Sequence, residues 1–404
     1  MRGDYSVFTL ITLMQSGYSA ISLFLAVFLI QVKDVPVSSV GVVYIVSGVV
    51  LVLILTLSGK LSDLIGTKTM TIFSAAGSAA VCVLLSAFLV MGMPALAYII
   101  TYPFLGLFTT LPSLSLSSYM SDRKGTGMPN GLSLIYSGTN LGYAIGPVSG
   151  GFVISIFGYF GLFLFGFLVS GATLAVSAFG LRENSKYARR VVFERNPDGS
   201  RFHSSRSLMP LLFLIFLSWF VISYQGVPIS VYESTYIDLS SIDIGLILTT
   251  NGLLIIILQP SISKLVAIEK RHSLIPIALG SLLMSGGFVL FAIFRTFLLL
   301  EAAISITTMG EMMIAVQSQI ALSLFSRANS RGSYQGYYFA FSRAGASLAF
   351  YTGPLSFAVF APTVFVGWYA VTIISICAAV GYFVLSPFFV RDLRNIEKGL
   401  DPAI

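Results

Sequence analysis

Long apolar stretches separated by short polar segments run through the whole chain. A helix needs about 20 apolar residues to cross the hydrocarbon of a bilayer. Twelve runs of about this length are present, at residues 8–32, 37–58, 70–91, 94–118, 131–156, 159–181, 208–236, 243–267, 273–294, 296–325, 333–361 and 363–389. Transmembrane β-strands would instead alternate apolar and polar residues. The pattern therefore predicts an all-α polytopic membrane protein with 12 transmembrane helices.

Composition and charge agree with this prediction and add a topology. Charged residues make up only 10% of the chain, against roughly 25% in soluble proteins. Twenty of the 23 Lys and Arg residues fall on one side of the predicted helices. Because cytoplasmic loops carry an excess of Lys and Arg, we expect both termini in the cytoplasm and the protein in the cell membrane. The net charge of +7 thus reflects topology within the lipid bilayer, and no nucleic-acid partner is expected.

The longest polar segment, Arg182–Ser207, divides the chain into two similar halves. Glycines at positions 41 and 48 recur as Gly245 and Gly252, and Gly146-Pro147 recurs as Gly353-Pro354. We therefore predict two pseudo-symmetric six-helix bundles, at 1–181 and 208–390. A cytoplasmic central loop at 182–207 joins them, and a cytoplasmic tail follows at 391–404.

A polar turn between the second and third apolar runs carries a recognisable spacing. Gly59, Asp63, Gly66 and Lys68 resemble the G-x-x-x-D-x-x-G-[RK]-[RK] loop of the major facilitator superfamily (MFS). The resemblance covers the whole chain and implies the MFS fold, with halves that rock about a midplane site. It also implies that these four residues form a conformational latch. Leu64 and Thr67 depart from the motif, since that family usually has basic residues there.

Helix five carries a stripe of glycines at four-residue spacing. Gly142-Tyr143-Ala144-Ile145-Gly146-Pro147-Val148-Ser149-Gly150-Gly151 resembles a string in drug:proton antiporters of the same superfamily. Four-residue spacing places glycines on one helix face, where they let backbones approach closely in lipid. We interpret the stripe, and a weaker one at Gly332, Gly336, Ala340 and Ala344, as bearing faces between the halves; a generic packing face is the alternative. The helix-five residues assigned to packing or to a kink are Gly138, Gly142, Gly146, Pro147 and Gly150.

Two charges lie well inside the predicted helices. Glu311 is near the middle of helix ten, and Arg343 is in helix eleven at a depth differing by roughly 6 Å, from the 1.5 Å rise per residue. Charges inside a membrane are costly and usually functional. We predict that they pair and that Glu311 exchanges a proton during transport; a static ion pair is the alternative. Glu233, near the outer end of helix seven, is expected to contact water, with gating of the outer mouth as the alternative.

Polar and aromatic residues in several helices are candidates for a substrate cavity. In the family that the loop resembles, helices one, four, seven and ten line this cavity. Helix seven also carries Tyr224-Gln225-Gly226-Val227-Pro228, in which polar groups lie beside an expected kink. The candidates are Gln15, Tyr18, Tyr98, Tyr102, Asn140, Tyr143, Tyr224, Gln225, Asn251 and Gln317.

Together these features indicate a secondary transporter of a small organic, amphipathic substrate that works by alternating access. Proton-coupled drug efflux is the leading interpretation. Import or uniport of a sugar or other neutral metabolite is the alternative, and a membrane sensor that does not transport is an alternative of another class. Phosphate-loop and hydrolase motifs are missing, so we expect no enzyme activity. We expect no cofactor and no metal site, and a monomer that binds a small molecule and protons.

Overall fold

The computed structural model describes residues 2–51, 65–121, 128–181, 207–266, 273–325 and 331–397. These ranges are helical and contain no strand. Within them, nine helices are long and apolar enough to cross a membrane. A shorter apolar helix, Val37–Leu51, and α13 (Arg331–Val359) correspond to two further predicted spans. The predicted all-α polytopic fold is confirmed.

The first half of the chain follows the predicted spans closely. Its helices are α1 (Arg2–Gln31), α2 (Val37–Val40), which begins the Val37–Leu51 helix, α4 (Thr67–Val90), α5 (Ala95–Ser121) and α6 (Met128–Gly180). α6 contains two predicted spans, which Gly158 separates with a φ of 63° and a ψ of −166°. Because a side chain at this φ would be strained, glycine suits this one-residue break between helices five and six.

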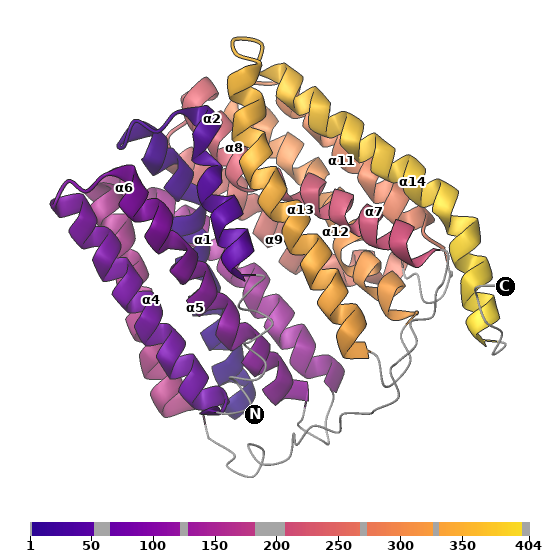
Figure 1. The fold of residues 1–404 in the computed structure, drawn as a ribbon, viewed down its shortest axis with the longest axis horizontal. Coiled ribbons are helices and arrows are strands. Elements are labelled where there is room, and N and C mark those ends of the chain that lie inside the picture. The colour runs from indigo at the N-terminus through magenta and orange to yellow at the C-terminus, as the bar shows by residue number, and fades with distance from the viewer. Residues whose placement is uncertain are drawn as a thin grey trace. The chain divides into compact units, whose positions relative to one another are not determined.

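The second half contains a broken helix seven and five further helices. Helix seven consists of α7 (Leu208–Ser223), α8 (Val227–Tyr232) and a π-helical segment, η1 (Glu233–Ile237). The others are α9 (Ser241–Leu265), α11 (Ile275–Ile293), α12 (Phe297–Ser323), α13 and α14 (Phe365–Glu397). Figure 1 shows these helices by label and colour.

Contacts between residues group the chain into two compact units. The first contains Met1–Arg195 and Ser230–Ile256, and the second contains Asn196–Ile229 and Ile257–Ile404. In the first unit α6 packs against α1, α4 and α5; in the second α7 packs against α13 and α14, and α11 against α12 and α14. The domain boundaries expected from the sequence stay a prediction. The units differ from them mainly in placing the first part of α9 with the N-terminal helices.

The glycine stripe of α6 is buried against α1 of the same unit. A Cβ atom added at Gly142 would lie 2.7 Å from the Thr12 carbonyl oxygen, and one at Gly146 would lie 2.6 Å from that of Ser16. Ser19 also donates a hydrogen bond to the Gly142 carbonyl oxygen, at 3.2 Å. The interpretation of this face as a bearing between the halves therefore needs correction. The glycines let α1 and α6 approach so closely that only hydrogen fits between them.

Helix eleven repeats this arrangement with different glycines from those expected. Cβ atoms added at Gly345 and Gly353 would lie 2.3 Å from the Phe216 carbonyl oxygen and 2.4 Å from the Pro228 ring. Gly345 and Gly353 lie 207 residues after Gly138 and Gly146, the separation that also relates Gly146-Pro147 to Gly353-Pro354. A Cβ at Gly336 would meet open space. The faces of α13 and α6 that contact helices seven and one are thus related by the repeat, and the predicted Gly336 stripe is not the face that packs on α7.

The first part of α9 contacts α6 through small residues. A Cβ at Gly245 would lie 2.6 Å from the Pro147 carbonyl oxygen, and one at Gly252 would lie 2.7 Å from Ala144 Cα. Thr249 donates a hydrogen bond of 2.6 Å to the Ala144 carbonyl oxygen. The glycines that revealed the internal repeat therefore have a packing role, and this contact joins Ser241–Ile256 to the first unit.

A buried carboxylate of α14 caps the start of α7. Asp392 is 1% exposed. Its Oδ2 accepts hydrogen bonds from the backbone N–H of Ser207, at 3.2 Å, and from the Ser207 hydroxyl. Negative charge is favourable at a helix N-terminus, where N–H groups lack partners within the helix. This contact therefore anchors helix seven to helix twelve.

We predict that Asp392→Asn lowers the stability of the protein. The amide loses the charge-assisted bond to the Ser207 N–H, and loss of such a cap costs about 1–2 kcal/mol. Thermal unfolding of the detergent-purified variant measures the effect. The matched control is Asp243→Asn, because Asp243 also accepts a hydrogen bond from a serine, Ser240, but does so at an exposed position. Equal unfolding temperatures for the two variants would contradict the prediction.

Candidate functional site

Polar side chains of helices seven and ten meet in the interior of the second unit. Gln225 Nε2 donates a hydrogen bond of 2.9 Å to Glu311 Oε2. The oxygen of the same amide, Gln225 Oε1, accepts a hydrogen bond of 2.8 Å from the Thr307 hydroxyl. The Thr308 hydroxyl lies 3.5 Å from this oxygen. Both threonines are fully buried and Gln225 is 6% exposed. We call Gln225, Thr307, Thr308 and Glu311 the polar cluster; the threonine hydroxyls face the Gln225 oxygen, and the Gln225 amide nitrogen donates to the Glu311 carboxylate.

The polar cluster lies where helix seven is interrupted. α7 ends at Ser223 and α8 begins at Val227, so Gln225 is the middle residue of a three-residue turn that interrupts the α-helix. Pro228 follows, and proline removes a backbone donor and disfavours a continuous helix. In transporters, interrupted helices supply polar groups to midplane sites. The sequence-based expectation of polar groups beside a kink at Tyr224–Pro228 matches this geometry.

The proposed partner of Glu311 lies on α13. Arg343 is exposed, and Tyr338, five residues earlier on the same helix, is 3% exposed. Tyr338 accepts a hydrogen bond of 3.1 Å from Trp219 Nε1 and donates one of 3.0 Å to the Ala315 carbonyl oxygen. This chain of bonds links helices seven, eleven and ten. The pairing of Arg343 with Glu311 stays a prediction.

A cluster of tyrosines forms the corresponding polar region of the first unit. The Tyr102 hydroxyl donates a hydrogen bond of 3.3 Å to the Tyr18 hydroxyl, and the two rings are stacked at 6.4 Å. Tyr44, from the Val37–Leu51 helix, packs edge-on against Tyr102 at 5.7 Å and donates to the Ser22 carbonyl oxygen. We call these three residues the tyrosine cluster. It combines aromatic faces with hydroxyl groups, which suits an amphipathic ligand.

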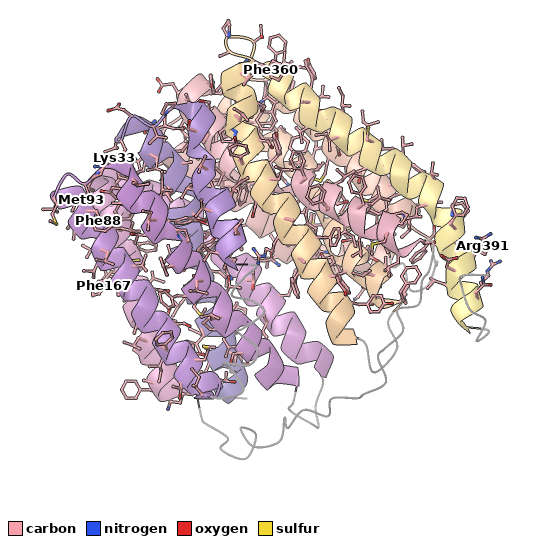
Figure 2. All side chains as sticks on the ribbon, in the orientation of Figure 1. Lys33, Phe88, Met93, Phe167, Phe360 and Arg391 are labelled. Carbon is pink, nitrogen blue, oxygen red and sulfur yellow. The ribbon has the colours of Figure 1, made fainter. Side chains whose placement is uncertain are left out.

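Two other candidate tyrosines are packed inside their units. Tyr98 is fully buried among aromatic rings that include Phe28 and Phe163. The Lys33 ammonium group lies 5.2 Å from the Tyr98 ring centroid and donates to the Met93 carbonyl oxygen; Figure 2 labels Lys33 and Met93 on neighbouring segments. Tyr224 is 2% exposed and contacts Phe220, Phe288 and Trp368. Their aromatic contacts give both residues a packing role, and their role in a cavity stays a prediction.

The remaining candidates have mixed surroundings. Gln15 packs its Cβ against Gly142, and its buried Oε1 has no hydrogen-bond partner. Asn140 donates to the Tyr136 carbonyl oxygen of its own helix. Gln317 is 1% exposed on α12, and Tyr143 and Asn251 are half-buried on α6 and α9. Contact of these residues with a substrate stays a prediction.

Each unit also contains a hollow. In the first unit, a cavity of about 20 Å³ lies beside Tyr18, between α1, α4, α5 and α6. It has room for about one water molecule. In the second unit, an apolar pocket of about 300 Å³ is lined by Leu208, Met209, Leu212, Tyr337 and Phe341. Its volume is at the lower end of the range for small-molecule sites.

The predicted latch is only partly within the described residues. Gly59 and Asp63 lie outside them. Gly66 immediately precedes α4 and has a φ of 81°, which glycine adopts without steric cost. Lys68 lies in the first turn of α4 and is half-buried. The latch itself stays a prediction.

Glu233 differs from its expected setting. The residue is fully buried, whereas the sequence suggested contact with water at the outer end of helix seven. It is the first residue of the π-helical segment η1, a conformation that often occurs at functional sites. The π-helix was not foreseen, because no sequence period distinguishes it from an α-helix.

Sequence reasoning missed several members of the two clusters. Thr307 and Thr308 directly precede Met309-Gly310-Glu311, and the four-residue spacing of Thr307 and Glu311 on one helix face could have revealed the first. Nothing in the sequence marks Tyr44 as a member of a polar cluster, because it is a single tyrosine in an apolar run. Gln259 was also overlooked; its Nε2 donates to Ser263 Oγ at 2.8 Å and to the Met312 carbonyl oxygen at 3.1 Å. Within the described residues, no group of His, Cys, Asp and Glu could hold a metal ion.

Apolar helices that carry polar clusters inside membrane-spanning segments define a polytopic membrane protein. The sequence model of the Major Facilitator Superfamily matches residues 7–350. The chain therefore belongs to the Major Facilitator Superfamily, whose members are membrane transporters.

Solved structures of POT family transporters share this fold. One in complex with 5-aminolevulinic acid has a TM-score of 0.78 and 14% sequence identity over 96% of this chain and 96% of its own. Another, in complex with a thioalcohol-conjugated peptide, has a TM-score of 0.80 and 14% identity over 96% of each chain. A peptide transporter POT in complex with sulfate has a TM-score of 0.75 and 15% identity over 96% of this chain and 95% of its own. At these identities the similarity shows the fold alone. No curated protein sequence matches the chain.

Proposed function

We propose that the protein is a proton-coupled secondary transporter of small amphipathic organic molecules. The observation that carries this proposal is the hydrogen bond between Glu311 and Gln225 at the break in helix seven. A carboxylate inside a transmembrane segment is costly and is usually retained for function. Because a carboxylate can gain and lose a proton, Glu311 is the group proposed to couple proton movement to transport.

The substrate class follows from the chemistry of the two units. The tyrosine cluster offers aromatic faces with hydroxyl groups, and the pocket at Leu208–Leu212 offers an apolar wall. Such surfaces suit a molecule with an apolar body and a few polar groups. We propose alternating access as the mechanism, a monomer as the working form, and cytoplasmic termini in the cell membrane. Drug efflux, suggested by the helix-five string, is one member of this substrate class.

Flux into proteoliposomes tests the proposal. The purified protein is reconstituted with an imposed pH gradient, and three probes are offered: a lipophilic cationic dye, 5-aminolevulinic acid and a dipeptide. We expect saturable movement of at least one probe that a protonophore collapses. Flux that does not change with the pH gradient would contradict proton coupling and would indicate uniport. Binding without flux would support the sensor alternative.

We predict that Tyr102→Phe weakens substrate binding. The change removes the hydroxyl that donates to Tyr18 and leaves the ring in place. Loss of one such bond costs about 0.5–1.5 kcal/mol, which corresponds to about a two- to tenfold rise in KM. Initial rates of flux for the transported probe measure this change.

The matched control for that variant is Tyr382→Phe. Tyr382 is fully buried in the other unit, and its hydroxyl is bonded to Ser218 at 2.9 Å. Both changes remove one buried phenol hydroxyl, but only Tyr102 belongs to the tyrosine cluster. An unchanged KM in Tyr102→Phe, or an equal rise in both variants, would remove the tyrosine cluster from the proposed site.

A further inference from the structure

The break in helix seven has the hydrogen bonding of a hinge. Three successive N–H groups, those of Tyr224, Gln225 and Gly226, donate to the carbonyl oxygens of Val221, Ile222 and Ser223, at 3.1–3.2 Å. Each bond spans three residues, as in a 3₁₀-helix, whereas an α-helix would span four. A 3₁₀ stretch inside a helix often marks a functional hinge. Bending at these three residues would change the angle between α7 and α8.

One side chain of the hinge is held at both ends by helix ten. The Gln225 amide nitrogen donates to Glu311, and its oxygen accepts from Thr307. A hydrogen bond to a charged group contributes about 1.5–3 kcal/mol, and one between neutral groups about 0.5–1.5 kcal/mol. The strength of the Gln225–Glu311 bond therefore depends on whether Glu311 carries its charge.

The threonine at the other end can adjust when this bond changes. The Thr307 hydroxyl lies 2.8 Å from Gln225 Oε1 and 2.9 Å from the Ile304 carbonyl oxygen. A hydroxyl has one hydrogen to donate, so Thr307 can donate to only one of these acceptors at a time. If Gln225 were released, the Thr307 hydroxyl would donate to the Ile304 carbonyl oxygen of its own helix. The Thr308 hydroxyl already donates to this oxygen, at 2.7 Å.

Few ionisable groups surround the polar cluster. α12 packs against α7, α11 and α13. Neither α7 nor α11 contains an ionisable side chain. α13 supplies Arg331, Arg343 and four tyrosines, at 334, 337, 338 and 351, and α12 itself also carries Glu301. Among these groups, Glu311 is the acid that bonds to the hinge.

We propose that Gln225 is a positioning residue that sets the angle of helix seven according to the charge of Glu311. With Glu311 ionised, the charge-assisted bond holds the hinge against helix ten. When a proton binds to the carboxylate, the bond becomes one between neutral groups, and the hinge is released to bend. This inference rests on the proposed proton binding by Glu311. It adds the element that converts the proton into movement of helix seven.

The distance between the two ends of helix seven tests the inference. Spin labels are attached to cysteines introduced by Met209→Cys and Thr235→Cys. The native Met209 is 67% exposed, and Thr235 is exposed as well. The native cysteines, Cys82 and Cys377, are replaced by alanine and serine. We expect the distance distribution of the reconstituted protein to shift between alkaline and acidic pH. The shift should be lost in Gln225→Leu, which keeps the size of the side chain and removes both polar atoms.

Three further variants make the result specific. Gln319→Leu, the same substitution at a half-buried position of α12, should keep the pH-dependent shift. Thr307→Val, which removes the other hydrogen bond to Gln225, should reduce it. The exchange Gln225→Glu with Glu311→Gln keeps an acid–amide pair between the same helices and should restore the shift. A role in stability alone would not produce loss and restoration of a pH-dependent distance.

The outcomes separate this inference from the proposed function. A wild-type shift that persists unchanged in Gln225→Leu, or that is lost equally in Gln319→Leu, would overturn the role of Gln225. Absence of any shift in the wild type would overturn it as well. Flux of Glu311→Gln tests the proposed function independently, because that variant keeps an acceptor for Gln225 and loses the titratable group. If Gln225→Leu does not fold, Thr307→Val and the exchanged pair decide the question.

Discussion

Glu311→Gln is expected to abolish proton-driven transport while the protein still folds and inserts. Glutamine has nearly the same shape, and its side-chain oxygen can accept the hydrogen bond from Gln225 that Glu311 now accepts. It cannot take up or release a proton. Coupling between two bound species is typically worth about 1–3 kcal/mol, or about 5- to 150-fold. We therefore expect the accumulation driven by a pH gradient to fall by about tenfold or more.

Flux in proteoliposomes at a series of external pH values measures this loss. The wild type should show pH-dependent flux, and Glu311→Gln should show flux that does not change with pH. Glu301→Gln is the control, because it makes the same change in the first turns of α12, ten residues before Glu311. If Glu311→Gln transports with the pH dependence of the wild type, Glu311 has a structural role and the proposed coupling is wrong.

Gly142→Val is expected to prevent most of the protein from folding. A Cβ atom at this position would lie 2.5 Å from Gln15 Cβ, 2.7 Å from the Thr12 carbonyl oxygen and 2.9 Å from the Ser16 nitrogen. Two of these three atoms belong to the backbone of α1, so no side-chain rotation relieves the overlap. Overpacking costs about 1–3 kcal/mol and sometimes more. Here α1 and α6 would have to separate, and the cost should reach or exceed the top of that range.

The yield of monodisperse protein and its unfolding temperature measure the effect. Gly171→Val is a matched control on the same helix, because a Cβ at Gly171 meets no atom within 4 Å. We expect that control to resemble the wild type. Similar yields and unfolding temperatures for the two variants would show that α1 and α6 are farther apart at Gly142 than they are in the structure.

Much of the fold follows from the sequence because hydrophobicity and glycine act locally. The apolar runs predict the helices, and Gly158 falls between the runs predicted for helices five and six. The glycine stripe likewise predicts a close helix contact. The stripe does not specify which helix it contacts, because a row of glycines can pack closely against any helix with a suitable surface. Its partner, α1, therefore became known only from the structure, and the expected contact between the halves was wrong.

The candidate site shows the same limit. Glu311 stands out in the sequence because a charge in an apolar run is conspicuous. Its hydrogen-bond partner Gln225 is one of ten cavity candidates in the sequence, but nothing in the sequence joins positions 225 and 311. Tyr44 and the two threonines of α12 are common residues in apolar helices, so composition gave no reason to select them. The burial of Glu233 depends on contacts with residues far away in the sequence, and such contacts cannot be predicted from a single sequence.

The comparisons support the superfamily and leave its subdivisions open. The family match spans residues 7–350, and the structural neighbours named above are POT family transporters at 14–15% identity. They lend no support to the drug-exporter resemblance of the helix-five string. That string includes Gly142, Gly146 and Gly150, which pack on α1. The close packing of α1 on α6 therefore accounts for these glycines without reference to a substrate.

Both tryptophans of the chain, Trp219 and Trp368, belong to the second unit. Trp368 is fully buried, stacked on Phe288 and Phe291 with centroid distances of 5.9 and 5.0 Å. Trp219 lies on α7, five residues before the first residue of the hinge, and donates a hydrogen bond to Tyr338. Tryptophan fluorescence, selected by excitation at wavelengths that tyrosine does not absorb, therefore reports on this unit alone. With Trp368 replaced by phenylalanine, the emission of the folded variant becomes a label-free optical signal from a single indole close to the proposed hinge.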